Sequence, residues 1–195
     1  MKGILLKDAL TGKRVLMICV LMILLFYPSG SSGMFFVLSY SIMVPVNLLA
    51  LDERSRFERY AAILPLTGLQ CVADKYIMTY LCMTVMLLLS VLAAWMRTGA
   101  AVLMDSVLLC ASMVLVTHAL TMPPLIRVGV ARGQWIYLLA IIIEFGASAA
   151  IGKLGGEGIL QTVEAFAGII FFAALTINVG SMFVSARLFD QRMEL

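Results

Sequence analysis

A long uncharged stretch, VLMICVLMILLFYPSGSSGMFFVLSYSIMVPVNLLAL, runs for 37 residues from Val15 to Leu51. A helix needs about 20 mostly apolar residues to cross the hydrocarbon core of a bilayer. The segment PSGSSG, residues 28–33, divides the stretch with turn-forming residues. The stretch therefore predicts a tight hairpin of two membrane spans, near 15–31 and 34–51.

The composition of the whole chain agrees with a membrane protein. Of its 195 residues, 63% are hydrophobic and 13% are charged, and the mean hydropathy is +1.05. Soluble globular domains carry about 25% charged residues, so a soluble core of this size could not bury so much apolar surface. The first apolar run also lacks the small-residue cleavage pattern of a secretory signal. We expect residues 1–195 to form one integral membrane domain.

Four more apolar segments have the length of a membrane span: 76–96, 100–122, 134–152 and 165–186. Together with the hairpin they give the predicted fold class, an all-α polytopic membrane protein with six transmembrane helices. The first span is short. It is expected to begin inside the amphipathic segment 1–14, whose lysines can reach the headgroups.

The lysines and arginines give the predicted orientation. If the N-terminus is cytoplasmic, twelve of the 14 basic residues fall on the cytoplasmic side, and two, Arg97 and Lys153, fall outside. Cytoplasmic loops carry an excess of Lys and Arg, so both termini are predicted to be cytoplasmic. The net charge of +3 is then explained by the basic cytoplasmic segments and their contact with anionic membrane lipids. No nucleic-acid partner is predicted.

The most charged segment is DERSRFERYAAILP, residues 52–65, whose first eight residues hold six charges. It begins the longest predicted connection, a cytoplasmic loop between the second and third spans. A short helix here would place Phe57, Tyr60 and Leu64 on one face of an otherwise charged surface. Two interpretations remain open: the helix docks into a groove of a protein partner, or it lies on the headgroups as an interfacial helix.

Turn and cap signals follow this segment. Pro65 disfavours helical geometry at the residue before it and would end the short helix. Thr67 followed by Gln70 forms a capping box, which would start a new helix that runs into the third span. The loop is therefore predicted to contain a short helix, a turn and a re-entry helix.

Residues 52–76 resemble the pattern D-E-x-x-x-W-x-x-Y-x-x-x-L-P-[ST]…K-Y of small bacterial type 2 ABC transporter permeases, a group that includes phenol-soluble-modulin exporter permeases. The opening MKGILLKDAL is also similar to that family, and the resemblance covers about the first 80 residues. Phe57 stands where tryptophan is usual, which keeps the aromatic ring and loses an N–H donor. The matching positions are Asp52, Glu53, Tyr60, Leu64, Pro65, Thr67, Lys75 and Tyr76.

The resemblance implies that the loop holds a coupling helix, which sits in a cleft of a separate ATP-hydrolysing subunit. The residues that would couple to this partner are Asp52, Glu53, Arg56, Phe57, Tyr60, Leu64 and Pro65. The chain would then be the permease subunit of an exporter in a bacterial cytoplasmic membrane, moving amphipathic or hydrophobic substrates, with peptides the first expectation. The alternative is a non-transporting adaptor, immunity or sensor subunit that docks a partner through the same loop.

Because one chain cannot enclose a path between two halves, we expect a complex of two permease chains, identical or related, with two ABC ATPase subunits. ATP and magnesium would be bound by the ATPase. The nearest thing to a phosphate loop in this chain is GASAAIGKL, residues 146–154, which has five residues between its glycines and no Ser or Thr after the lysine. A working phosphate loop needs four residues there and a hydroxyl for magnesium. No cofactor is therefore predicted in this chain.

No catalytic or metal site is predicted, and the chain is not expected to be an enzyme. The one histidine, His118, has no cysteine or second histidine at metal-ligand spacing. It falls near the cytoplasmic end of the predicted fourth span, where we expect a role at the helix end or the interface.

A few polar residues fall at membrane depth, where they tend to face a bundle interior or a water path. Glu144 is the eleventh of nineteen residues in the predicted fifth span, close to mid-bilayer. We expect it to point into the dimer interior, bonded to a polar neighbour such as Asn178 or exposed to water. Asp105 and Glu164 are further candidates for the substrate path, although both can also reach the outer interface. Residues 153–164 could form either a short re-entrant helix or a glycine-rich loop.

Overall fold

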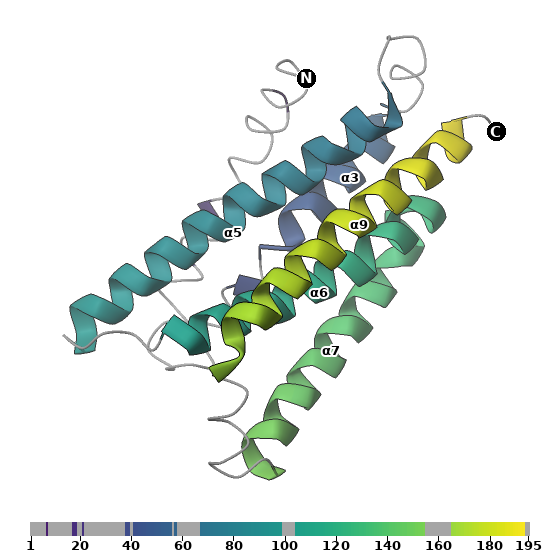
Figure 1. Ribbon diagram of the computed structural model, residues 1–195. Helices are drawn as coiled ribbons and strands as arrows, with labels where there is room; N and C mark the ends of the chain where they lie inside the picture. The colour runs from purple at the N-terminus through teal and green to yellow at the C-terminus, as the bar shows by residue number, and fades with distance from the viewer. Residues whose placement is uncertain are drawn as a thin grey trace.

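Five long helices form the described part of the chain. The computed structural model describes residues 7, 17–18, 21, 38–39, 41–55, 57, 67–98, 104–154 and 165–193. Within them the structure is helical and contains no strand, so the predicted all-α class is confirmed (Figure 1). The helices are α3 (Met43–Ser55), α5 (Gly68–Thr98), α6 (Met104–Val128), α7 (Val130–Leu154) and α9 (Ala167–Met193).

Three described helices contain segments long and apolar enough to cross a membrane: residues 68–89 of α5, 107–128 of α6 and 167–191 of α9. They correspond to the third, fourth and sixth predicted spans. The fifth predicted span, 134–152, lies within α7. The first lies outside the described residues apart from positions 17, 18 and 21, so the six-helix count stays a prediction.

The fourth span is predicted to end at Met122, and the helix that contains it runs further. Helix α6 continues through Pro123 and Pro124 to Val128. Proline has no N–H, so Pro123 leaves the carbonyl of Ala119 without its intrahelical donor. The Ser181 hydroxyl of α9 donates to that carbonyl at 2.6 Å. Neighbouring helices can replace a lost backbone bond in this way, which allows proline inside a membrane helix.

The helix that contains the end of the predicted second span also runs beyond it. Helix α3 runs without a break from Met43 to Ser55, so Asp52 and Glu53 belong to it rather than to a separate coupling helix. Pro45 stands in its first turn, where proline is tolerated because that N–H has no intrahelical partner. Residues 58–66, which would hold most of the predicted coupling helix, lie outside the described residues.

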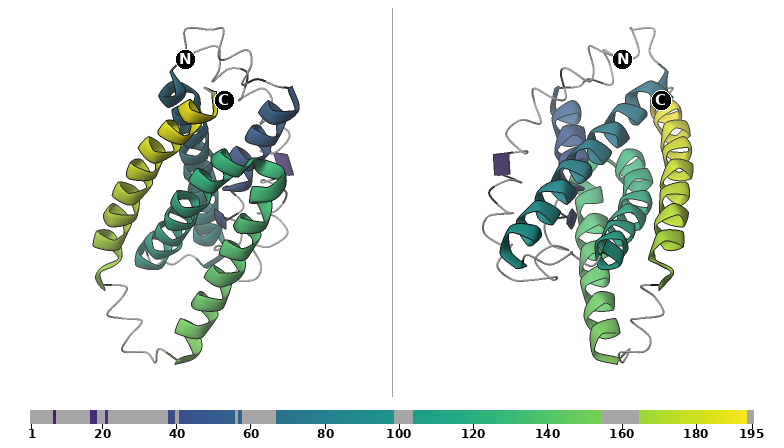
Figure 2. Two further views of the ribbon diagram at one scale, coloured as in Figure 1. Left: turned by 90° about the vertical axis from the view of Figure 1, so that its right-hand side faces the viewer. Right: turned by 60° about the vertical axis from the view of Figure 1, so that its left-hand side comes forward.

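The five helices pack as a ring. Helix α3 contacts α5, α5 contacts α9, α9 contacts α6, α6 contacts α7, and α7 closes the ring against α3, with the most extensive contact between α6 and α9. Helices α3, α6 and α9 end, and α5 and α7 begin, at the same end of this ring. From there α5 and α7 diverge toward the opposite end (Figure 1 and Figure 2).

The outer faces of α7 and α9 are strongly apolar and exposed. Trp135 and Ile142 of α7 are 68% and 69% exposed, and Ile169 and Phe172 of α9 are 68% and 70% exposed. Such side chains would be unfavourable in water, but they suit contact with lipid chains. The arrangement is that of a multi-pass membrane protein.

Candidate functional site

The shared end of the ring gathers the polar residues of the predicted cytoplasmic segments. We call it the charged end and define it by Asp52, Glu53, Lys75, Gly129 and Asp190. These residues come from the end of α3, the start of α5, the turn between α6 and α7, and the end of α9. Segments that are predicted to share one side of the membrane therefore lie together.

Asp52 joins three parts of the chain. Its Oδ2 lies 2.7 Å from the Lys75 Nζ of α5, and its Oδ1 accepts a hydrogen bond from the Lys7 Nζ at 2.6 Å. The Lys75 and Asp52 side chains are only 5% and 13% exposed. Lys7 also lies over the ring of Phe57, 3.8 Å from its centroid, in a cation–π contact. Arg56, another of the predicted coupling residues, lies outside the described residues.

Glu53 binds the N-terminus of α7. Both of its carboxylate oxygens accept the backbone N–H of Val130, each at 3.1 Å. The first N–H groups of a helix have no intrahelical acceptor and carry partial positive charge, so a carboxylate stabilises them. Gly129, just before, has a φ of +89°, and a Cβ there would lie 2.9 Å from Glu53 Oε1. The turn therefore requires glycine for its backbone conformation and for the approach of Glu53.

The start of α5 is built in the same way. The predicted capping box is confirmed, because Gln70 N donates to Thr67 Oγ1 and Thr67 N donates to Gln70 Oε1, both at 3.4 Å. Gly68 N donates to Asp190 Oδ1 of α9 at 3.0 Å, and a Cβ at Gly68 would overlap that carboxylate. Acids from α3 and α9 thus fix the N-termini of α7 and α5.

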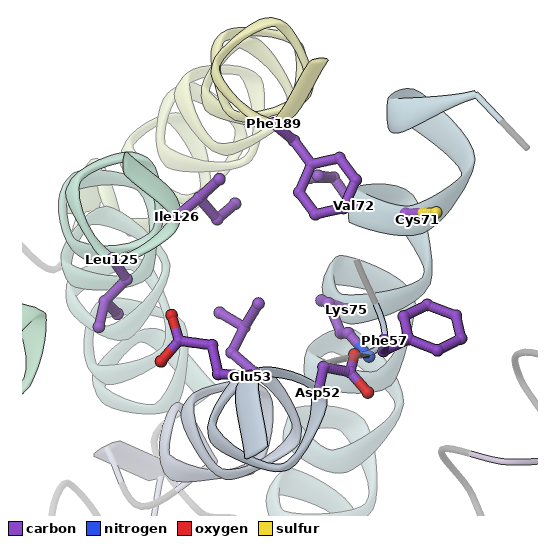
Figure 3. A pocket seen from close by; sticks show the side chains of 10 residues that line it. Asp52, Glu53, Phe57, Cys71, Val72, Lys75, Leu125, Ile126 and Phe189 are labelled. Atoms are coloured by element: carbon purple, nitrogen blue, oxygen red, sulfur yellow. Dashed lines mark ion pairs between the residues drawn. The ribbon is translucent and has the colours of Figure 1, made fainter. Parts of the chain in front are cut away.

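A partly open pocket lies between these anchors (Figure 3). Figure 3 shows it enclosed by α3, α5, α6 and α9, with Asp52, Glu53 and Lys75 along one side and apolar side chains along the rest. The lining residues are Leu49, Asp52, Glu53, Phe57, Cys71, Val72, Lys75, Leu125, Ile126 and Phe189. Of the other predicted coupling residues, Tyr60, Leu64 and Pro65 lie outside the described residues.

Comparison with known families identifies the type of protein. Residues 3–190 match the family described as ABC-2 family transporter protein. This chain belongs to the ABC-2 transporter family. It is therefore an ABC transporter permease, a membrane transport subunit whose family implies an ABC ATPase partner. Searches of curated proteins and of solved structures found no match to the chain.

Inside the permease, His118 is more deeply buried than expected. Its predicted place is near the cytoplasmic end of the fourth span, in a role at the helix end or the interface. It is instead 0% exposed and lies in the middle of the apolar segment 107–128 of α6, because α6 continues past the two prolines. The Tyr76 ring of α5 packs edge-on against it, with 4.7 Å between the ring centroids.

Hydrogen bonds connect His118 to α5 and α9. Its Nε2 lies 3.2 Å from Thr79 Oγ1 of α5, and its Nδ1 lies 3.1 Å from Asn178 Nδ2 of α9. Asn178 Nδ2 also donates to the Leu115 carbonyl at 2.7 Å, and Asn178 Oδ1 accepts from Tyr80 Oη at 2.6 Å. We call His118, Thr79, Asn178 and Tyr80, together with the Tyr76 contacts to Ser181 and Ser185, the His118 network.

The sequence contains a pattern of polar residues that points to this network. Tyr76, Thr79 and Tyr80 share one face of α5, and Asn178, Ser181 and Ser185 share one face of α9, by helical spacing. On apolar membrane helices, such polar stripes indicate contacts between helices.

Glu144 is buried in the permease but has a different neighbour from the one expected. It is 8% exposed and lies beside Thr117 of α6. Neither carboxylate oxygen meets hydrogen-bond geometry with a described residue. Asn178, the partner suggested by the sequence, is engaged by the His118 network instead.

Of the other two candidates for the substrate path, one lies in a described helix. Asp105 is the second residue of α6, at the end of the ring opposite the charged end. Glu164 lies outside the described residues, as does most of the segment 153–164. A shared path that includes all four polar residues stays a prediction.

Proposed function

We propose that this permease is the membrane subunit of an ABC exporter that moves amphipathic or hydrophobic substrates, peptides first, out of a bacterial cell. The energy comes from ATP, bound with magnesium and hydrolysed by a separate ATPase subunit. Two permease chains, identical or related, assemble with two ATPases, because one ring of five or six helices offers no path between two halves.

The observation that carries this proposal is the anchoring of the charged loop at its base. Asp52 is bonded to Lys75, and Glu53 is bonded to the N-terminus of α7. Movement of the loop segment that follows Glu53 is therefore passed directly to α5 and α7. This is what a loop that receives movement from an ATPase requires.

The predicted coupling residues then divide into two groups by role. Asp52 and Glu53 face the permease itself and hold the loop in place. We expect Phe57, Tyr60 and Leu64 to form the apolar stripe that docks into the ATPase, with Arg56 on the charged face of the predicted coupling helix and Pro65 at its end. Phe57 belongs to both groups, since Lys7 of the same chain lies over its ring.

Co-purification with the ATPase tests the docking stripe. Phe57→Asp combined with Tyr60→Asp should leave the permease inserted in the membrane and abolish co-purification of the ATPase, because charge replaces the apolar contacts. Phe57→Trp, which restores the residue usual in the family pattern, is the matched control and should retain the partner. Wild-type recovery of the ATPase with the double aspartate variant would contradict the proposal.

A transport assay tests the direction and the substrate class. Inside-out vesicles that contain the permease and its ATPase should take up a fluorescent amphipathic helical peptide when ATP is added. ATP hydrolysis by an assembled complex without uptake of the peptide, of a labelled lipid or of a hydrophobic dye would favour the adaptor or sensor alternative.

A further inference from the structure

We propose that the His118 network positions α5 against the α6–α9 pair and transmits movement from the charged end into the membrane. This inference rests on the proposed function, because transmission has meaning only if an ATPase moves the loop. His118, Thr79 and Asn178 are then positioning residues, which act on transport through the packing of three helices.

The donors and acceptors of the network define a single protonation pattern. Asn178 Nδ2 can only donate, so His118 Nδ1 must accept and carries no hydrogen. The hydrogen of a neutral imidazole then lies on Nε2, which donates to Thr79 Oγ1. Thr79 Oγ1 in turn donates to the Lys75 carbonyl at 2.9 Å. His118 is therefore neutral, and each bond in this series has one donor and one acceptor.

The network connects one movable element to one compact pair. Side chains of α9 bond to backbone carbonyls of α6, from Asn178 to Leu115 and from Ser181 to Ala119, so α6 and α9 behave as a unit. Helix α5 contributes only hydroxyl groups to the network, from Tyr76, Thr79 and Tyr80. A hydroxyl can rotate to a new acceptor, whereas a backbone carbonyl cannot.

Tyr76 shows how α5 could shift at low cost. Its Oη lies 3.0 Å from Ser181 Oγ and 3.1 Å from Ser185 Oγ, two hydroxyls one helical turn apart on α9. A movement of α5 along α9 in either direction loses one of these bonds and keeps the other. Because an unsatisfied polar group in hydrocarbon is costly, the network favours movements that preserve its bonds.

The charged end acts on the same part of α5. Lys75, which is bonded to Asp52, directly precedes Tyr76 and lies one turn before Thr79 on the same continuous helix. A displacement of Asp52 therefore acts on α5 within one helical turn of the His118 network. The His118–Thr79 and Tyr80–Asn178 bonds determine how much of this movement reaches α6 and α9.

The first test uses the fact that the chain contains a single histidine. Protein labelled with ¹⁵N-histidine, purified in nanodiscs through a histidine-free tag, should give the nitrogen signals of one neutral ring with its hydrogen on Nε2. Asn178→Leu should lose this single tautomer, and Thr176→Val on α9, whose hydroxyl donates to the Phe172 carbonyl of the same helix, should keep it. An Nδ1–H tautomer, a tautomer mixture or a charged ring in the wild type would overturn the network, whether or not an ATPase is found.

The second test compares two threonines of α5. Thr79 and Thr84 both donate to the carbonyl four residues earlier, but only Thr79 also accepts from His118. Thr79→Val therefore removes one bond between helices that Thr84→Val leaves in place, and Thr79→Ser keeps it. The readout is the distance between spin labels at exposed positions 88 of α5 and 172 of α9, with and without ATP and vanadate.

The expected result separates positioning from stability. In a cysteine-free background, with labelled chains diluted in unlabelled ones, all three variants should bind the ATPase and give the wild-type distance without nucleotide. Thr79→Val alone should shift the balance of the two ATP-dependent distances by about fivefold, which corresponds to about 1 kcal/mol. Equal ATP responses of Thr79→Val and Thr84→Val would overturn the proposal, and so would loss of assembly in Thr79→Val alone.

Discussion

Asp52 of α3 and Lys75 of α5 form a buried ion pair, with 2.7 Å between Oδ2 and Nζ. These two residues are the first and last positions of the long loop predicted between the second and third spans, so the ion pair closes the loop at its base. Both also match the pattern of type 2 ABC permeases. The ion pair therefore gives a physical reason why both residues occur in one pattern, 23 positions apart.

Loss of the Asp52 charge should destabilise the permease. Asp52→Asn leaves a buried lysine facing a neutral amide, and breaking a buried ion pair from one side costs about 3–5 kcal/mol. We expect a clear fall in the thermal midpoint of the purified protein in detergent. Arg54→Gln, an exposed change two residues later on the same helix, is the control and should have little effect. Equal midpoints for the two variants would contradict the role of this pair.

The turn at Gly129 should tolerate no side chain. Gly129→Ala places an L-residue at a φ of +89° and brings its Cβ against Glu53, so we expect a loss of about 1–3 kcal/mol in unfolding free energy. Gly180→Ala in α9 is the matched control, because a Cβ there meets no atom within 4 Å. Chemical denaturation in detergent compares them. A Gly129→Ala protein as stable as the control would show that Glu53 does not hold this turn.

Glu144 should affect transport more than assembly. It is buried beside Thr117 at membrane depth, so we expect Glu144→Gln, which keeps size and polarity, to preserve assembly and basal ATP hydrolysis but to change peptide uptake. Glu144→Leu separates the two roles. A residue that lines the path should lose transport with the complex intact, whereas a purely structural one should lose stability. Full transport by both variants would rule out a functional role for the charge.

The orientation can be tested by labelling introduced cysteines from outside the cell, after the native ones are replaced. Positions 30–33, 98 and 155–157 should react, and positions 55–59, 130 and 190 should be protected. The structure already groups 55, 130 and 190 at the charged end and 98 at the opposite end. Outside labelling at position 56 would reverse the orientation and remove the basis for the coupling loop.

Local signals in the sequence predicted much of the fold. The capping box of Thr67 and Gln70 acts within one turn, so it could be read from residue types alone, and the structure confirms it. The apolar lengths located the helices for the same reason. The continuation of α6 through Pro123 could not be read from local sequence, because the Ser181 bond that replaces the lost donor comes from a helix 58 positions later.

The candidate site was less predictable because its contacts are between distant segments. Asp52 bonds to Lys7 and Lys75, which stand 45 and 23 positions away from it in the sequence. His118 was judged by the absence of metal-ligand neighbours in sequence, while its partners come from α5 and α9. Charge and helical spacing identify candidate polar residues in the sequence, but they do not show which of these residues contact one another in the fold.

The single-residue connection at Gly129 limits how α6 and α7 can move. One residue between two long helices keeps their ends at a constant separation, and Glu53 ties the same point to α3. The joined ends of α6 and α7 therefore stay together, and the two helices can change the angle between them. A small rotation at this pivot becomes a displacement of several ångströms at the far end of α7, which lies 25 residues, or about 37 Å, away. The far end of α7 would then move away from α6 while the contacts of Glu53 at the charged end stay in place.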